Sequence, residues 1–467
     1  MHDFTEQVFN DLSKRSDVDQ LEIYCSSNKV SGLRIVNSEL HESKLIMDSG
    51  TGVRVLRGGF TGFDSVASLS IERARECYDR AVKVASARMG EKEDITFEKP
   101  PTEGKTLKTR NFLDVRLEQM HDEELAELGK RMVDSALSHD KCVRDCSGSI
   151  TVVSYEFSVM NSNGINANDR GGYTYATLTS IANDGEQRSQ GFDTLVTKKY
   201  SNLVNQIGSV GKQSAEMSVG SLGSRQPESG KHEIIFKPSC LSSTMRNLGL
   251  MSNGQRVQDG LSMFTEFLDK KVASDIVNMV EDGQLEEGIH TCSVDDEGQP
   301  TRRTTVIEDG ILRSFMHDSY TASKIGVQST GNGFRVWTQV GGSTIEGKRY
   351  DFPPTCSSVN FMLLPGDMKE EELIQDTKRG ILMGWTRYER LLNSKTGAFT
   401  ANARSGNFKV ENGELKYPVH GFRIHDNYSN LLKSINAIAN KAEQKGHWGM
   451  AAISPSFRAR DIGIIST

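Results

Sequence analysis

The sequence lacks several features that would assign it to a broad functional class. It has no block of lysine and arginine that could follow a phosphate backbone, and its 56 basic and 62 acidic residues give a net charge of −6. Direct binding to nucleic acid is therefore not expected. No apolar run approaches the roughly 20 residues that span a bilayer, and the first residues show no secretory signal. These absences predict a cytoplasmic protein with no membrane partner.

A disulfide framework is also absent. The chain has 7 cysteines, an odd number, and they are widely spaced in 467 residues, which favours a reducing compartment. His139, Cys142 and Cys146 are suitable zinc ligands by type, but their spacing fits no common structural zinc site and no second ligand pair follows. We therefore interpret them as incidental residues near the end of a helix.

Cys240 is the strongest candidate for a nucleophile. It follows Pro238-Ser239 at an expected helix start, where the helix dipole could lower the pKa of a thiol. With His232 or His317 it could form a Cys-His pair. The sequence shows no proximity between these residues, so a buried structural cysteine is the default interpretation.

The length of the chain predicts two domains, because one hydrophobic core rarely serves so many residues. The small, polar and turn-rich segment 220–230 is the expected boundary, which gives domains at 1–222 and 223–467. We expect an α+β fold, with an antiparallel sheet and helices in the N-terminal domain. The C-terminal domain is expected to be mostly antiparallel strands and barrel-like.

Periodicity places the elements within these domains. Residues 20–65 and 147–200 alternate as strands, whereas 71–85 and 122–136 carry apolar residues at helical spacing. The C-terminal part predicts a strand at 234–236, helical segments to about 266, and helices near 369–379 and 428–442. Turn chemistry is clearest at Gly58-Gly59, Asp309-Gly310 and Asn412-Gly413, each of which predicts a hairpin.

Several phrases occur in a characteristic order along the C-terminal part. They are Val272-Ala273-Ser274, Asp295-Asp296-Glu297-Gly298-Gln299-Pro300, Met316-His317-Asp318-Ser319-Tyr320, Ser329-Thr330-Gly331-Asn332-Gly333, Pro365-Gly366-Asp367 and Glu411-Asn412-Gly413-Glu414-Leu415-Lys416-Tyr417-Pro418. Together they resemble the TldD/PmbA family, also called the modulator of DNA gyrase family, over essentially the full length. The resemblance implies a heterodimeric peptidase that degrades unfolded peptides, in which TldD-type subunits hold zinc and PmbA-type (TldE) subunits do not.

The zinc motif of TldD-type relatives is missing from this chain. The resemblance places His-Glu-x-x-x-His at 245–250 and a third ligand, a cysteine, near the C-terminus. Met245 and Leu250 stand at the histidine positions, Arg246 at the position of the general base, and Trp448 at that of the cysteine. Leucine cannot ligate zinc, a thioether binds it poorly, and a guanidinium cannot accept a proton. No catalytic residue and no metal ligand is therefore expected in this chain.

The resemblance predicts a metal-free, PmbA-type subunit that contributes a substrate chamber and an interface to a TldD-type partner holding zinc. A homodimer is expected in isolation. His317 and Asp318, within one of the family phrases, could line the peptide cavity or the interface, or could be structural. Two alternatives remain: a peptidase in its own right, through Cys240 or an unforeseen metal site, and a regulatory protein that binds a topoisomerase.

Overall fold

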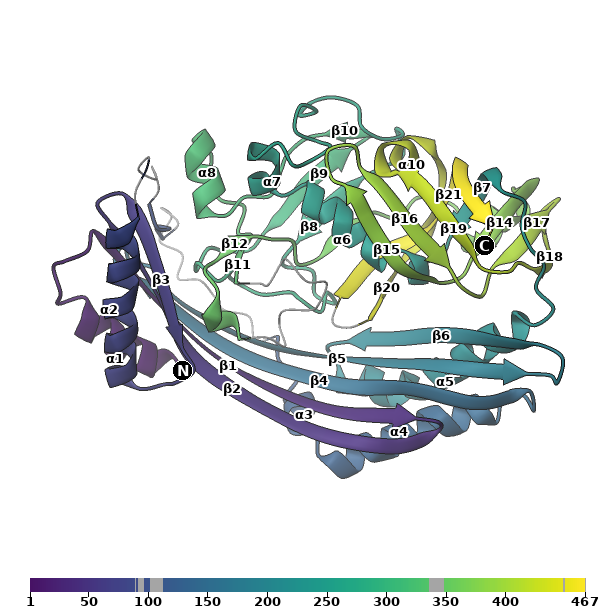
Figure 1. The fold of residues 1–467 in the computed structure, drawn as a ribbon, viewed down its shortest axis with the longest axis horizontal. Helices are drawn as coiled ribbons and strands as arrows, with labels where there is room; N and C mark the ends of the chain where they lie inside the picture. The colour runs from purple at the N-terminus through teal and green to yellow at the C-terminus, as the bar shows by residue number, and fades with distance from the viewer. Residues whose placement is uncertain (89, 91–95, 101–111, 336–347, 448–449, 467) are drawn as a thin grey trace.

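The computed structural model describes residues 1–88, 90, 96–100, 112–335, 348–447 and 450–466. Two large β-sheets dominate the molecule, and the C-terminal part lies across the concave face of the long, curved N-terminal sheet (Figure 1). This arrangement confirms the α+β fold. Within the ranges just given, no helix is long and apolar enough to cross a membrane.

The N-terminal sheet has six strands in the order β3-β2-β1-β4-β5-β6, and every neighbouring pair is antiparallel. Gly58 and Gly59 both have positive φ, at 59° and 86°, and form the predicted turn between β2 and β3. The strands are β1 (Gln20–Val36), β2 (Glu39–Arg57), β3 (Phe60–Val66), β4 (Val143–Asn161), β5 (Asn166–Asn183) and β6 (Arg188–Thr197).

The described residues of the N-terminal half (residues 1–222) form five helices, and the helices predicted at 71–85 and 122–136 are among them. They are α1 (His2–Leu12), α2 (Ile71–Ala87), α3 (Val115–Glu118), α4 (Asp122–Leu137) and α5 (Tyr200–Gly220). The sequence did not predict α5, because its many Ser and Gly residues have low helix propensity. Those small residues allow close packing: a Cβ atom on Gly211 would lie 2.1 Å from the carbonyl oxygen of Met132 on α4.

The two faces of the N-terminal sheet are buried against different parts of the chain. Successive residues of a strand point to opposite faces. Leu21 and Ile23 therefore pack in one core with α1 and α2. Tyr24 points the other way and packs with Tyr350 of the C-terminal half. As a result, polar side chains on this second face become buried rather than solvated.

The C-terminal sheet has thirteen strands, most of them antiparallel, as predicted; β13–β21 and β14–β7 are parallel. Its pairings branch at β21 and do not close into a ring, so the expected barrel-like closure is wrong for the described strands. The strands are β7 (Gly230–Phe236), β8 (Met279–Asp282), β9 (Arg303–Glu308), β10 (Ile311–Leu312), β13 (Phe361–Leu363), β14 (Arg379–Met383), β15 (Thr386–Asn393), β16 (Ala398–Ala403), β17 (Phe408–Glu411), β18 (Glu414–Pro418), β19 (Phe422–Asn427), β20 (Ile435–His447) and β21 (Met450–Ser466).

Short helices and one further strand pair complete this half: η1 (Pro238–Cys240), α6 (Ser242–Met251), α7 (Gly254–Gln258), α8 (Ser319–Ile325), η2 (Arg349–Asp351), α9 (Glu370–Gln375), α10 (Tyr428–Ser434), β11 (Gly333–Phe334) and β12 (Thr355–Cys356). The helix predicted at 428–442 is wrong beyond α10. From Ile435 the chain forms β20, because pairing with the long β21 outweighs a weak local preference for helix.

The two hairpins predicted from turn chemistry are confirmed. Asp309 and Gly310 have φ of 48° and 75° between β9 and β10, and Asn412 and Gly413 have φ of 52° and 79° between β17 and β18. Two consecutive positive φ values are the geometry that Asn-Gly and Asp-Gly adopt most readily. The predicted boundary segment lies between α5, the last helix packed on the N-terminal sheet, and β7 of the second sheet.

Candidate functional site

The helix α6 carries the positions at which the family resemblance places a zinc motif. It follows η1 and packs against β13, β15 and β21. Met245 is only 1% exposed and belongs to the main core of the C-terminal half, together with Leu248 and Met251. The residue at the first ligand position is therefore a core side chain surrounded by apolar groups.

Arg246 and Leu250 lie four residues apart on α6, and both are partly buried. Burial lowers the pKa of Arg246, and the positive charge of Arg256 lowers it further. Arginine nevertheless stays protonated at any physiological pH, so this side chain cannot accept a proton from water. Met245, Arg246 and Leu250 do not fit a zinc ion, which takes nitrogen, thiolate or carboxylate ligands. Trp448, at the expected third position, lies outside the described residues.

The polar side of α6 contacts a carboxyl group that the sequence did not single out. Glu389 of β15 accepts hydrogen bonds from the Thr244 hydroxyl at 2.8 Å and the Tyr428 hydroxyl at 2.5 Å. The Asn247 amide donates to Tyr428 at 2.8 Å. Burial raises the pKa of Glu389 to about 7. No sequence signal reveals this group, because its partners lie far along the chain and its own strand carries several charged residues.

The other candidate ligands and nucleophiles are separated or buried. Cys146 is in the core beneath α4, whereas Cys142 is partly exposed near the start of β4. In the described part of the chain, no group of three or more His, Cys, Asp or Glu side chains has the geometry to hold a metal ion. Cys240 is 1% exposed, and its thiol donates to the carbonyl of Met383 at 3.1 Å. Burial raises the pKa of Cys240, which disfavours the reactive thiolate.

His317 and Asp318 lie just before α8, where they perform a structural task. Asp318 caps the helix by accepting from the backbone N–H of Thr321 at 2.9 Å and from its hydroxyl at 2.6 Å. The Nδ1 atom of His317 lies 3.2 Å from the same hydroxyl. Its ring packs so closely on Gly254 that a Cβ atom there would come within 2.4 Å. Burial lowers the pKa of His317, consistent with a neutral, packed imidazole.

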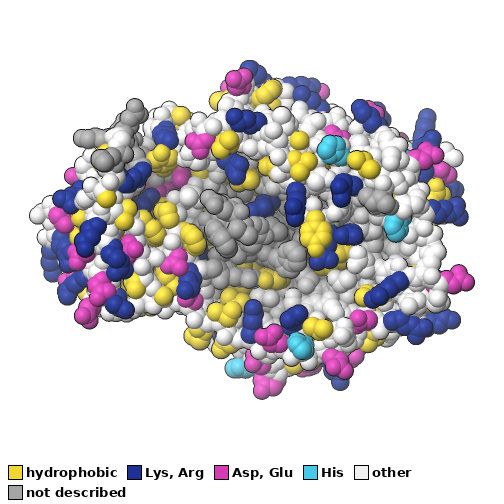
Figure 2. All heavy atoms as spheres, viewed as in Figure 1, with side chains coloured by type: hydrophobic (Ala, Val, Ile, Leu, Met, Phe, Trp, Pro, Cys, Tyr) yellow, Lys and Arg dark blue, Asp and Glu magenta, His cyan; other side chains and the backbone are white. Residues whose placement is uncertain are grey.

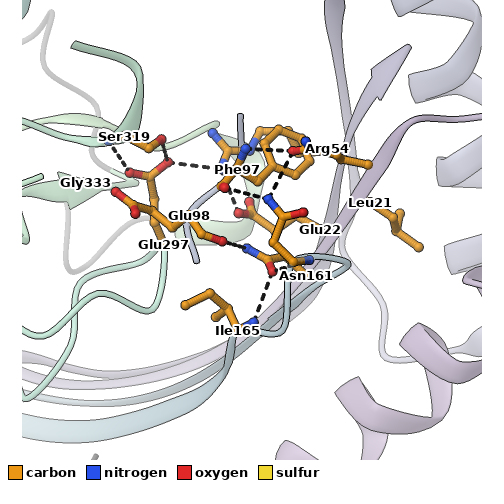
Figure 3. Close-up of polar contacts among 12 residues, drawn as sticks. Leu21, Glu22, Arg54, Phe97, Glu98, Asn161, Ile165, Glu297, Ser319 and Gly333 are labelled. Atoms are coloured by element: carbon orange, nitrogen blue, oxygen red, sulfur yellow. Dashed lines mark hydrogen bonds and ion pairs between the residues drawn. The ribbon is translucent and has the colours of Figure 1, made fainter. Parts of the chain in front are cut away.

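The junction between the two halves holds a group of buried, oppositely charged side chains. Figure 3 shows Arg54 of β2 between Glu22 of β1 and Glu297 of the C-terminal half. Its guanidinium lies 2.6 Å from Glu22 and 3.0 Å from Glu297. Arg335, with no exposed side-chain surface, lies 2.6 Å from the other oxygen of Glu22 and 4.3 Å above the ring of Tyr24. Charges from both halves thus neutralise each other at this junction.

Further carboxyl groups surround this cluster, and the pKa of each is raised. Burial, and then the negative charge of Glu297, raises the pKa of Glu98 to about 7 and that of Asp318 to about 6. The same two causes raise the pKa of Asp295 well above its usual value. The family phrase around residue 297 thus has a structural role, because Glu297 also accepts from the backbone N–H of Ser319 at 2.8 Å.

Three family profiles match the chain. They are described as PmbA/TldA metallopeptidase domain 1, over residues 21–85, the central domain, over 116–222, and the C-terminal domain, over 229–466. The first two segments build the same six-stranded sheet and its helices.

Curated relatives and solved structures agree with these profiles. A metalloprotease TldD homolog from Buchnera aphidicola is 24% identical, over 91% of this chain and 86% of the relative. The metalloprotease PmbA of Escherichia coli O157:H7 is 23% identical, over 90% of this chain and 88% of the relative. The crystal structure of TldE from Thermococcus kodakarensis has a TM-score of 0.86 at 21% identity, and covers 99% of both chains. A protein from Thermotoga maritima described as a modulator of a DNA gyrase has a TM-score of 0.85 at 24% identity, again over 99% of both chains.

Proposed function

This chain belongs to the PmbA/TldD metallopeptidase family, and we propose that it is a subunit that binds no metal and performs no catalysis itself. One observation carries the proposal: at the place where the resemblance puts a zinc motif, α6 presents a core methionine, a protonated arginine and a leucine. A metallopeptidase needs a metal to activate water and a base to accept its proton. Neither role can be filled by these three side chains.

The proposed partner is a TldD-type subunit that holds zinc, and the proposed substrate is unfolded peptide. In this arrangement the chain contributes part of a substrate chamber and helps to hold extended peptide near the zinc of the partner. Extended segments can add to free sheet edges through main-chain hydrogen bonds, which selects for conformation more than for sequence. The two-domain division at 222/223 and a cytoplasmic location form part of the same proposal.

The free part of β2 is the surface that best suits a partner chain. β3 pairs with β2 only over 51–57, so the described chain leaves one edge of residues 39–49 unpaired. Leu45, Ile46 and Met47 are consecutive and are 55%, 45% and 73% exposed, so neither face of the strand is covered there. An open edge with exposed apolar side chains favours association with another chain. In isolation the same edge could support a homodimer.

The alternative of an independent thiol peptidase has no geometric support, because Cys240 is buried and donates its hydrogen to a backbone carbonyl. Regulation of a topoisomerase rests on the description of structural relatives as gyrase modulators, and no feature of the described residues favours it.

The test compares peptidase activity on an unstructured peptide for this chain alone, a TldD-type subunit alone, and their mixture. We expect little cleavage by this chain alone and cleavage in the mixture that stops when zinc is removed from the partner. Elemental analysis of this chain alone should show well under one zinc per chain. Stoichiometric zinc, or robust cleavage without a partner, would refute the proposal.

A matched pair of variants tests the partner surface. Leu45→Glu on β2 and Leu392→Glu on β15 change leucines that are 55% and 54% exposed. The first should weaken association with the partner tenfold or more, because a charge would be buried in an apolar contact, a cost of about 1.4 kcal/mol for each factor of ten. The second should leave association unchanged. Size-exclusion chromatography of each variant mixed with the partner measures the association. If both variants changed association equally, the β2 edge would be excluded as the partner surface.

A further inference from the structure

A cavity of about 580 Å³ lies between the two halves, away from α6 and from the charged junction. Its walls come from β6 and the segment after α5 on one side, and from the chain around β16 and β19 on the other. Its size is within the range of pockets that bind small molecules. The cavity brings together residues that are far apart in the sequence, such as Arg188 and Arg404.

The lining of this cavity is basic. Arg188, Arg404, Arg423 and His420 contribute to it, and it contains no aspartate or glutamate. The chain as a whole has a net charge of −6, and basic and acidic side chains are interspersed over most of the face drawn in Figure 2. The lining of the cavity is therefore more positively charged than the surface around it.

The three arginines of the cavity lack ion-pair partners among the described residues. Arg423 donates to the amide oxygen of Asn402 at 3.4 Å, and the guanidinium of Arg404 lies 6.0 Å from the ring of Tyr388. Some other surface arginines bind carboxylates directly, such as Arg75, whose Nη2 lies 2.7 Å from Asp11. Guanidinium groups form paired hydrogen bonds with planar oxyanions, so three unpaired ones around a cavity favour an anionic ligand.

A buried hydroxyl in the lining also lacks a partner. Ser405 is 4% exposed, lines the cavity, and its Oγ makes no hydrogen bond to any described residue. Buried polar groups are nearly always hydrogen-bonded, because an unsatisfied one costs roughly 1–3 kcal/mol. A ligand oxygen bound between the arginines would give this hydroxyl an acceptor. This observation is independent of the charge of the lining.

We propose that this cavity binds the carboxylate of a peptide, at its C-terminus or on an acidic side chain. The inference rests on the proposed function, in which peptide is the substrate, and adds to it a preference for anionic peptides. The Arg404 and Arg423 guanidiniums bind the carboxylate oxygens, Arg188 supplies further positive charge, and Ser405 donates a hydrogen bond. The cavity then anchors one end of an extended peptide between the two halves, away from the charged junction.

The experiment measures equilibrium binding of dye-labelled peptides to the isolated full-length chain by fluorescence anisotropy. The probes are an unstructured peptide with neutral side chains and a free C-terminus, the same peptide amidated, and an amidated form carrying one glutamate. At least one carboxylate form should bind about tenfold more tightly than the neutral amide, and higher salt should weaken that binding. The two carboxylate forms distinguish the terminus from the side chain.

Variants then locate the binding. The double change Arg404→Gln with Arg423→Gln should weaken carboxylate binding by about tenfold or more, and Ser405→Ala by a few-fold. Arg390→Gln changes an exposed arginine of β15 outside the cavity and should have no effect. The arginines are all exposed, so unfolding midpoints should match the unmodified chain. The comparison of acid and amide peptides uses the unmodified chain, so it remains decisive even if a variant fails to fold.

Three results would overturn the inference: equal binding of the acid and the neutral amide, carboxylate binding that the double variant leaves unchanged, or binding of inorganic phosphate without binding of any carboxylate peptide. None of these measurements needs the partner or catalysis. A chain that binds carboxylates but fails to support peptidase activity would refute the proposed function alone. If the chain supports the peptidase activity of the mixture but binds the acid and amide peptides equally, only this inference is refuted.

Discussion

Restoring the zinc motif on α6 is the perturbation that tests the metal-free assignment most directly. The triple change Met245→His, Arg246→Glu and Leu250→His supplies two imidazoles and a carboxylate at the family positions. We expect it to create neither a zinc site nor peptidase activity. Trp448 remains where the resemblance places the third ligand, and no hydrogen-bonding groups have been selected to orient the new imidazoles.

The structure also predicts a loss of stability from this change. Met245 is 1% exposed in the core with Leu248 and Met251, so histidine there loses apolar contacts and buries a polar ring. Large-to-small changes at such sites cost roughly 2–5 kcal/mol, and an unsatisfied buried polar group costs about 1–3 kcal/mol. The larger imidazole leaves less cavity than alanine, so we expect Met245→His to lower the free energy of unfolding by about 3–4 kcal/mol.

Urea denaturation with and without added zinc, together with elemental analysis, provides the measurement. Met245→Leu conserves volume and should cost less than about 1.5 kcal/mol, which makes it the matched control. Leu250→His alone should cost less than Met245→His, because Leu250 is only partly buried. A triple variant that keeps the original stability, binds one zinc tightly and cleaves peptide would refute two expectations. These are that α6 cannot be converted to a zinc site and that Met245 is needed for the packing of the core.

Four further outcomes are expected. Cys240→Ala should leave the peptidase activity of the mixture within about twofold of the original, because burial raises the pKa of the Cys240 thiol and disfavours the nucleophilic thiolate. If this chain alone cleaved peptide and Cys240→Ala abolished that cleavage, the result would favour a thiol peptidase. Burial raises the pKa of Glu281 to about 7, so the folded state binds more protons than the unfolded state between about pH 4.5 and 7. The protonated Glu281 carboxyl therefore contributes fully to the free energy of unfolding below that window, and the contribution is lost as the pH rises through it. The loss should reach about 3 kcal/mol relative to Glu281→Gln. If the free energies of unfolding of the two proteins changed in parallel from pH 5 to 8, this prediction would be contradicted. Arg335→Met should cost about 3–5 kcal/mol in urea unfolding, because it removes a buried partner of Glu22. The exposed Arg313→Met should cost at most about 1 kcal/mol, and similar losses from both would show that the junction contributes little. Limited proteolysis should cut first within 221–229, between α5 and β7, whereas cleavage inside 300–320 that spares this segment would argue against the proposed domain boundary.

The turns and the clearest helices could be predicted from the sequence because their determinants are local. Glycine and asparagine adopt positive φ at little cost, so Asp309-Gly310 and Asn412-Gly413 predicted their hairpins without knowledge of the rest of the chain. The absence of histidine and glutamate from 245–250 was equally visible, since a missing ligand needs no structure to detect. The family phrases in the C-terminal part identified the family correctly.

Local patterns failed where sheet pairing or burial on two faces decided the outcome. Residues 435–442 read as helix but pair with β21, and the strands expected to form a barrel branch at β21 instead of closing. In β1 and β2, Glu22 and Arg54 alternate with apolar residues, and a polar face of this kind ordinarily faces water. The C-terminal half covers that face and supplies a partner for each charge, Glu297 for Arg54 and Arg335 for Glu22, so the charges become a buried cluster.

The sequence by itself therefore determined which chemistry is missing from α6, because metal binding requires particular side chains and their absence is decisive. Only the tertiary structure decided which chemistry is present elsewhere. Arg188, Arg404 and Arg423 form one basic cavity, and Glu389 meets Tyr428 beside α6, through packing of segments that are far apart in the chain. The cavity follows from how the two sheets pack against each other, whereas Glu389 and Tyr428 meet through strand pairing within the C-terminal sheet; no local pattern of residues encodes either contact.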